Sequence, residues 1–246
     1  MSSVTTAPAG TTARPTVGGA GVGIIVLDTG FERLPGDIAH TATWPFPVQF
    51  RIVRGVRPAD VITGDPAAAL AAFEDAIDDL VDHGAQAIAT SCGFLAAVQK
   101  ELAAYSPVPF ASSPLLQIPL AEATLPEGRQ VGLVVSDPEA IDERHFRGVG
   151  ARPGLPFVGL DPQGPILTTM RENARVDDPA LLEADALEAI DRLVRAHPEV
   201  GAIVLECANL PPYSAAIARR FARPVYDAVT LVTWLQSGIA PRRYPR

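Results

Sequence analysis

The chain has 246 residues, of which 48% are hydrophobic and 20% are charged. This length and composition fit one large α/β domain or two domains of about 120 residues each, with enough apolar residues for a sizeable core. The formal net charge is −8 at pH 7. An acidic chain lacks the basic surface that nucleic acid or an anionic membrane attracts, so we expect neither as a partner.

Only two cysteines occur, too few for the disulfide framework of a small secreted protein. The chain opens without a secretory leader pattern, and it has no run of about 18 apolar residues that could span a bilayer. We therefore expect a soluble, cytoplasmic protein. Residues 1–20 are rich in glycine, proline and threonine without a hydrophobic period, which predicts a flexible tail.

Short, β-branched apolar runs alternate with helical patterns along the rest of the chain, as in buried parallel sheets. The first half predicts strands at residues 22–27, 48–53, 85–90 and 108–111, and a helix over residues 66–82. A long, proline-rich segment at residues 33–47 is either a lid or a surface loop. The second half predicts strands near residues 130–135, 155–160, 201–205 and 224–226, and a helix over residues 179–196.

The two halves repeat each other in sequence. VGIIVLD, which starts at Val22, recurs 109 residues later as VGLVVSD, which starts at Val131. AIATSCG around Cys92 recurs 115 residues later as AIVLECA around Cys207. Matches in the same order, at slowly growing offsets, indicate an internal duplication with small loop insertions.

Alternating strands and helices predict parallel sheets flanked by helices, and the duplication predicts two similar α/β lobes. We expect the first lobe to comprise residues 21–125 and 221–246, and the second lobe residues 126–220. Ligands of such sheets bind beyond the carboxyl ends of the strands. The sequence therefore predicts one shared site in the cleft between the lobes.

Cys92 and Cys207 each follow a predicted strand, at or just before the start of the next helix. A helix N-terminus favours an anion, so a thiol at this position is expected to have a lowered pKa. Most isolated cysteines are inert core residues, but two at equivalent junctions of a duplicated chain favour a functional role. A structural disulfide is a weaker alternative in an intracellular protein.

Two thiols on facing lobes would approach a bound molecule from opposite sides. One thiolate could remove a proton from carbon while the other thiol delivers a proton to the opposite face, which is two-base racemisation. Backbone N–H groups that follow Cys92 and Cys207 could stabilise the developing enolate. This chemistry requires no cofactor, and the four histidines have no metal-ligand spacing, so we expect no metal.

Three motifs resemble those of a known group. Asp28-Thr29-Gly30 resembles the Asp-Ser-Gly motif after the first strand of glutamate racemases. Cys92 and the stretch Cys207-Ala208-Asn209-Leu210-Pro211 resemble the two cysteine motifs of the aspartate/glutamate racemase superfamily. The resemblance covers residues 20–238. It implies that Cys92 and Cys207 are the two acid/base residues and that Asp28 and Thr29 line the substrate pocket.

The chain also departs from the glutamate racemase pattern. Gly93-Phe94 stand where Asn-Thr usually follows the first cysteine, and Ala208-Asn209 stand where Thr-His usually follows the second. The substitutions indicate a different or less polar substrate than glutamate, bound by these four residues.

Ser112 follows the fourth predicted strand and is either a helix cap or a substrate contact. Glu206 precedes Cys207, so strand alternation predicts that its side chain points away from that thiol.

We expect an isomerase, a racemase or epimerase of a small carboxylate such as an amino acid or derivative. A maleate-type cis–trans isomerase with a cysteine nucleophile is an alternative, since such enzymes keep both cysteines. A ligand-binding relative without activity is another. The expected partner is the small carboxylate, and a homo-oligomer is compatible with the sequence.

Overall fold

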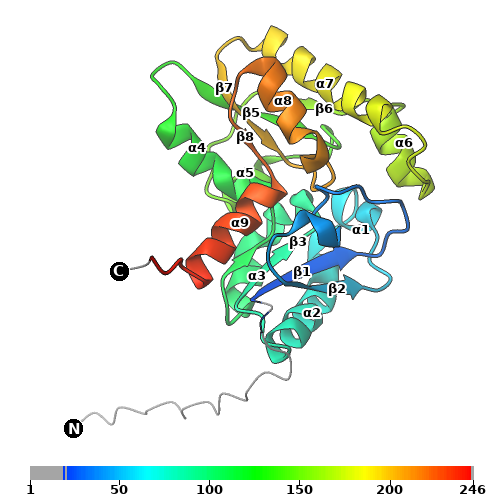
Figure 1. The fold of residues 1–246 in the computed structure, drawn as a ribbon, viewed down its shortest axis with the longest axis vertical. Coiled ribbons are helices and arrows are strands. Elements are labelled where there is room, and N and C mark those ends of the chain that lie inside the picture. The colour runs from blue at the N-terminus through cyan, green and yellow to red at the C-terminus, as the bar shows by residue number, and fades with distance from the viewer. Residues whose placement is uncertain (1–18, 20, 245–246) are drawn as a thin grey trace.

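Two four-stranded parallel sheets form the framework of the protein in a computed structural model that describes residues 19 and 21–244 (Figure 1). The first sheet has the order β2-β1-β3-β4 and the second the order β6-β5-β7-β8. The strands are β1 (Val22–Leu27), β2 (Val48–Val53), β3 (Ala87–Thr90), β4 (Phe110–Ala111), β5 (Gln130–Val135), β6 (Phe157–Gly159), β7 (Val200–Leu205) and β8 (Val225–Tyr226). The second order is the first with each number raised by four, so the predicted duplication and two-lobed fold are confirmed. The tail expected at residues 1–20 lies outside the described residues, apart from Gly19.

The helices of the first copy follow from local sequence signals. The predicted helix over residues 66–82 is a 3-10 turn, η2 (Pro66–Ala69), that continues into α2 (Leu70–Asp82). Asp65 caps this turn by accepting a hydrogen bond from the backbone of Ala67. The other helices are η1 (Thr41–Thr43), α1 (Pro58–Ile62), η3 (Gly93–Val98), α3 (Gln99–Tyr105), η4 (Pro114–Gln117) and α4 (Ile118–Thr124).

The second copy repeats this arrangement. Its long helix, α7 (Pro179–Ala196), has the predicted bounds, because Asp178 caps the first turn and proline occupies the first helical position. Three buried residues of α7, Ala189, Ile190 and Leu193, share the spacing of one helix face. The other helices are α5 (Glu143–Gly148), α6 (Pro165–Glu172), η5 (Pro211–Tyr213), α8 (Ser214–Phe221) and α9 (Ala228–Ile239).

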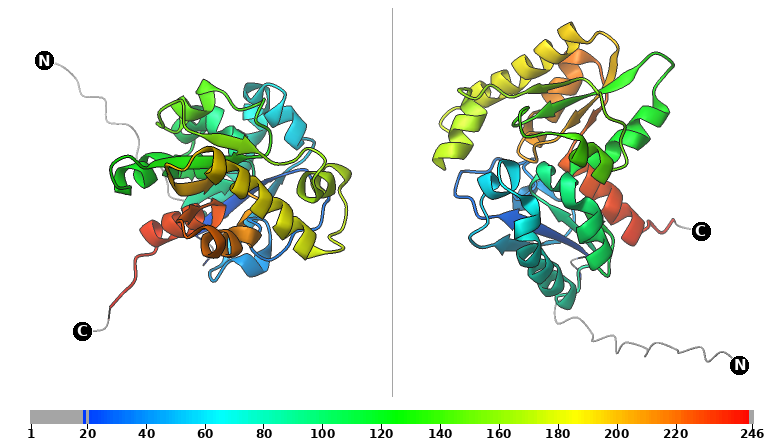
Figure 2. Two further views of the ribbon diagram at one scale, coloured as in Figure 1. Left: turned by 90° about the horizontal axis from the view of Figure 1, so that it is seen from above. Right: turned by 180° about the vertical axis from the view of Figure 1, so that it is seen from behind.

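The last helix of each copy packs against the sheet of the other lobe. Helix α4 follows β4 of the first sheet but packs against β5 and β7 of the second. Helix α9 follows β8 of the second sheet and returns to pack against β1 and β3 of the first, as the red helix of Figures 1 and 2 shows. The structure thus differs from the expected division in two ways: residues 225–226 pair within the second sheet, so that the return to the first lobe begins at α9, and α4, expected in the first lobe, packs against the second sheet.

The hydrophobic core is continuous between the lobes. One cluster joins first-lobe residues such as Phe73 and Leu95 to second-lobe residues such as Leu133 and Phe146. Helix α5 of the second lobe crosses η3 of the first so closely that Gly148 lies against the carbonyl group of Ala96. The second lobe therefore packs directly against η3, the helix that follows Cys92.

Candidate active site

A pocket of about 390 Å³, including the part open to solvent, lies at the carboxyl ends of the central strands of both sheets. Cys92 follows β3, and Cys207 follows β7. Both thiols line this pocket, and neither forms a disulfide. The predicted shared location between the lobes therefore brings the two cysteines to one cavity.

Cys92 lies at the N-terminus of η3 and is 6% exposed. Burial and the neighbouring carboxyl of Glu206 raise the pKa of the Cys92 thiol to about 12, although the backbone N–H groups of Phe94 and Leu95 act in the opposite direction. The expected lowering of this pKa is therefore wrong. A six-residue 3-10 helix supplies few oriented amides, and they do not compensate for the loss of water.

Cys207 is similarly buried, and its pKa is raised well above the usual value by burial and then by Glu206. The charge of Cys92 contributes to the same rise, so the two thiols are close enough to influence each other. The thiol of Cys207 lies 3.6 Å from Oδ1 of Asn209 and donates to it. Ionisation of either thiol thus requires a change in its surroundings, such as the binding of a polar ligand.

Glu206 is the third ionisable group of the pocket. Its side chain lines the cavity and is 1% exposed, contrary to the expectation that it points away. Strand β7 ends at Leu205, so strand alternation no longer sets the direction of the next side chain. Burial raises the pKa of the Glu206 carboxyl to about 7, against the effect of hydrogen bonds donated by the backbone and hydroxyl of Ser136.

The duplication extends into the hydrogen bonds of the site. In the first lobe, Oγ of Ser91 accepts a 3.2 Å hydrogen bond from the backbone of Leu27. In the second lobe, Oε2 of Glu206 accepts a 3.1 Å hydrogen bond from the backbone of Ser136. Ser91 and Glu206 each precede a cysteine, and Leu27 and Ser136 occupy matching positions in the repeat. The two copies therefore keep one contact while differing in the side chain that makes it.

Five residues predicted to bind substrate line the pocket, and two do not. The five are Thr29, Gly93, Phe94, Ala208 and Asn209. Asp28 instead accepts a hydrogen bond from the backbone of Gly55, outside the pocket lining. Ser112 is completely buried away from the pocket, while Ser113 caps η4.

Gly93 makes room for the carboxyl of Glu206. A methyl group on Gly93 would overlap both the carbonyl oxygen and Oε1 of Glu206. The neighbouring Phe94 packs edge-on against the buried His145 of α5, with ring centroids 5.3 Å apart. These contacts account for Gly-Phe at positions where glutamate racemases carry polar residues.

Arg33 was not singled out from the sequence, although it lines the pocket. Its guanidinium pairs with Asp37 at 2.8 Å, donates to Oγ1 of Thr29 at 2.8 Å and lies 4.4 Å from the ring centroid of Phe31. Asp37 also accepts a hydrogen bond from the side chain of Asn209 in the second lobe. No local sequence pattern marks Arg33, because its place in the pocket depends on the fold of the long segment at residues 33–47.

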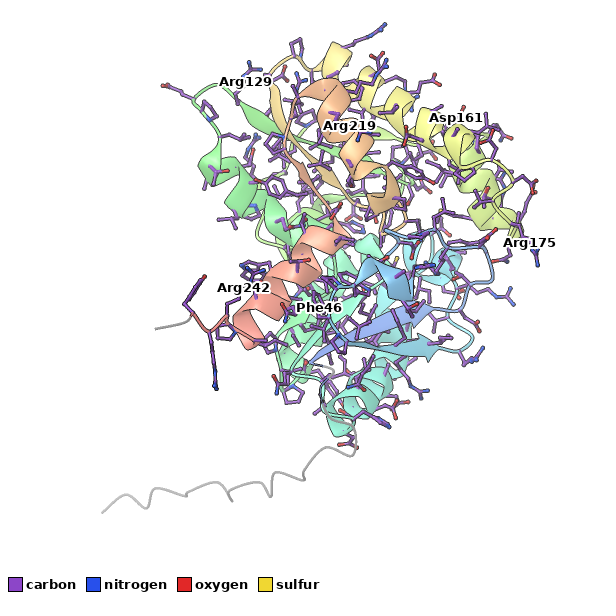
Figure 3. All side chains as sticks on the ribbon, viewed as in Figure 1. Phe46, Arg129, Asp161, Arg175, Arg219 and Arg242 are labelled. Atoms are coloured by element: carbon purple, nitrogen blue, oxygen red, sulfur yellow. The ribbon has the colours of Figure 1, made fainter. Side chains whose placement is uncertain are left out.

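The first-lobe loop that carries Arg33 is joined to the α6–α7 loop of the second lobe. The backbone of Gly30 donates to the side chain of Asn173, and the backbone of Glu32 donates to the carbonyl of Ala174. The backbone of Val176 donates to the carboxylate of Glu32 at 2.9 Å. We call these three hydrogen bonds the clasp. Arg175, labelled in Figure 3, lies between Ala174 and Val176 in the chain and marks their position.

Comparison with known proteins gives relatives by sequence and by fold. No protein-family model matches the chain. A dimethylsulfoniopropionate lyase from Durusdinium sp. clade D is 26% identical over 225 residues, which cover 87% of this chain and 73% of the relative. Dimethylsulfoniopropionate lyase 7 from Emiliania huxleyi (strain CCMP1516) is 26% identical over 85% of this chain, which spans only 64% of that relative.

Solved structures match nearly the whole chain. A glycine-to-cysteine variant of arylmalonate decarboxylase, in a sulfate-associated form, has a TM-score of 0.61 and 19% identity over 91% of this chain and 96% of its own. Allantoin racemase from Klebsiella pneumoniae has a TM-score of 0.61 and 19% identity, and the match covers 89% of this chain and 87% of the racemase chain. Aspartate racemase from Picrophilus torridus has a TM-score of 0.53 and 16% identity, and the match covers 91% of this chain and 96% of the racemase chain. The chain has the fold that these decarboxylase and racemase structures share.

The racemase-type fold accounts for the lobes and for the meeting of the two cysteine motifs at one pocket. Within residues 19 and 21–244, no group of three or more His, Cys, Asp or Glu side chains is arranged to hold a metal ion. In the same part of the chain, no helix combines the length and apolarity needed to cross a membrane.

Proposed function

We propose that this protein is an enzyme that removes the α-proton of a small carboxylate, with Cys92 and Cys207 as the acid/base pair of a racemase or epimerase. The observation that carries the proposal is the arrival of both thiols, from equivalent positions of the duplicated lobes, at one buried pocket. General acid–base catalysis from opposite sides of a carbon needs this arrangement.

The pocket also contains groups suited to hold a carboxylate. The backbone N–H groups of Gly93 and Ala208 have no acceptor among the described residues. Arg33 brings a positive charge to the same lining. Donors of this kind, aimed at a carboxylate, stabilise the enediolate that forms when the α-proton leaves.

A second candidate is a lyase, which the relatives favour. The matched relatives are dimethylsulfoniopropionate lyases, and the pocket lining includes the apolar side chains of Phe31, Ile62 and Met170, which suit a methylated group. In such a β-elimination, a thiolate takes the α-proton, the C–S bond breaks with its electron pair going to sulfur, and acrylate and dimethyl sulfide leave. Only one base is required.

The test follows deuterium incorporation by NMR in deuterium oxide. The panel contains chiral amino acids, hydroxy acids and hydantoins, together with maleate and dimethylsulfoniopropionate. For a two-base racemase, Cys92→Ser and Cys207→Ser each reduce turnover by about a hundredfold or more. For a lyase, one variant loses acrylate formation and the other retains most of it.

Two results would contradict the proposal that the protein is a racemase. Conversion of maleate to fumarate would assign an isomerase. No reaction of the wild-type protein with any compound, while heat-denaturation experiments show that the same compounds bind, would assign a ligand-binding relative.

A further inference from the structure

The carboxyl of Glu206 has one oxygen that the fold does not use. Oε2 accepts both hydrogen bonds from Ser136. Oε1 lies against Gly93 at the pocket and has no hydrogen-bond partner among the described residues. Among the described residues, the oxygen of Ser112 is the only fully buried polar side-chain atom without a partner, so Oε1 of Glu206 keeps access to the pocket, where a ligand can form a hydrogen bond with it.

The other lobe shows that the structural contact does not need a carboxyl. Ser91, at the matching position, accepts the equivalent backbone hydrogen bond with a hydroxyl alone. A serine at position 206 would therefore suffice for the fold. The longer, ionisable side chain supplies something beyond that contact.

The groups around Glu206 favour its neutral form. The thiols of Cys92 and Cys207 face it from the two lobes, and Asp137 after β5 adds a negative charge. Arg33 lines the same pocket but is already paired with Asp37. A buried carboxyl with no cation of its own is stabilised when it is protonated, and then it becomes a hydrogen-bond donor.

We propose that Glu206 is a neutral carboxylic acid that donates a hydrogen bond from its unused oxygen to the substrate carboxylate. This inference rests on the proposed function of the site. In the step it assists, the α C–H bond breaks, its proton goes to the thiolate, and the electron pair moves onto the substrate carboxylate to form an enediolate. Glu206 keeps its proton and shares it with the oxygen on which negative charge accumulates, as a protonated carboxyl in an apolar oxyanion hole does.

The first test compares kcat/KM of the wild type and Glu206→Gln between about pH 5 and pH 9. Glutamine retains a donor and does not ionise. Because the charge of Glu206 also raises the pKa of both thiols, the titration of the thiols is measured in each protein by the pH dependence of their alkylation with iodoacetamide, and the activity ratio is corrected for the difference. We expect a constant ratio at low pH that falls about tenfold per pH unit above the pKa of Glu206, about 7. Ser91→Ala is the matched control, because it removes the equivalent hydrogen bond without an ionisable group, and its ratio stays independent of pH.

The outcomes separate the two proposals. A ratio that rises with pH would assign Glu206 as a base, and a constant ratio would assign a purely structural role; either overturns the inference while the activity stands. Absence of activity in the wild type would instead contradict the proposed function.

A second test needs neither turnover nor a variant that folds. Infrared difference spectra of the wild type, with ¹³C-labelled glutamate, should show a protonated carboxyl that titrates near neutral pH and shifts when propionate is added. Absence of that band, or a band that propionate leaves unchanged, would overturn the inference.

Discussion

At the residue scale, the site depends on the absence of a side chain at Gly93. Gly93 follows the first cysteine and leaves the volume that the Glu206 carboxyl occupies. The space beside Cys92 is thus filled by the carboxyl of Glu206 from the second lobe, because position 93 has no side chain.

Replacement of Gly93 by alanine should therefore displace Glu206. We expect Gly93→Ala to lower the free energy of unfolding by about 1–3 kcal/mol, as overpacking does. We also expect at least a tenfold loss of activity, since a shift of about 1 Å can cost about a hundredfold. Urea denaturation and the exchange assay measure the two effects.

Gly238→Ala is the matched control. Gly238 lies in α9 with open space around it, so alanine there should be neutral or stabilise by up to about 1 kcal/mol. Equal free energies of unfolding of the two variants would mean that Glu206 moves away from the added methyl group without a cost in stability.

The sequence predicted the cysteines of the site better than their neighbours. Cys92 and Cys207 stand out because a strand pattern ends directly before each. Glu206 was misplaced because strand periodicity was extended one residue past the end of β7. The contribution of Arg33 depends on how a long loop folds back over the strands, which local patterns do not encode.

At the scale of elements, the clasp joins two loops that no sheet or helix connects. Its hydrogen bonds are exposed, and they close over the rim of the pocket. Exposed hydrogen bonds open more readily than those of the core, so the clasp is the natural place for the lobes to separate.

Removal of one carboxylate should loosen the clasp. In Glu32→Ala, the backbone N–H of Val176 loses its acceptor. A hydrogen bond contributes about 0.5–1.5 kcal/mol, so exchange of this amide should become about twofold to tenfold faster. Hydrogen–deuterium exchange of a peptide that spans residues 173–176 measures the change. Glu172→Ala, an exposed glutamate at the end of α6, should leave the rate unaltered, and equal rates in both variants would show that the clasp does not protect the loop.

Element bounds were predicted well where apolar patterns are long. Strands β1 and β2 and helix α7 have the predicted limits. The helix after Cys92 begins as a 3-10 helix, η3, that packs against α5 of the other lobe, and local sequence patterns do not reveal such a contact between the lobes.

At the scale of the whole molecule, the exchange of α4 and α9 and the shared core make the lobes interdependent. Each sheet is covered by a helix that belongs to the other copy in sequence. Neither lobe can therefore lose its structure without exposing apolar surface of its neighbour.

We expect one cooperative unfolding transition. Ile190→Ala, in the core of the second lobe alone, should cost about 2–5 kcal/mol. In a Trp234→Phe background, fluorescence of the buried Trp44 reports on the first lobe, and its melting temperature should fall by about 5–15 °C together with the circular dichroism transition. Leu181→Ala, on the exposed face of the same helix, should change little. A Trp44 transition that stays at the wild-type temperature would show that the lobes unfold separately.

The replacement of Ser91 by Glu206 at the matching position gives the pocket a handedness. The carboxyl of Glu206 has no counterpart on the side chain of Ser91, so the two faces of a planar intermediate, and therefore mirror-image substrates, meet different surroundings. Enantiomers nevertheless have equal free energies, and a racemase must therefore process both with the same kcat/KM. The inequality of the two faces can appear only as compensating differences in kcat and KM, whereas a lyase is under no such constraint and is free to prefer one face.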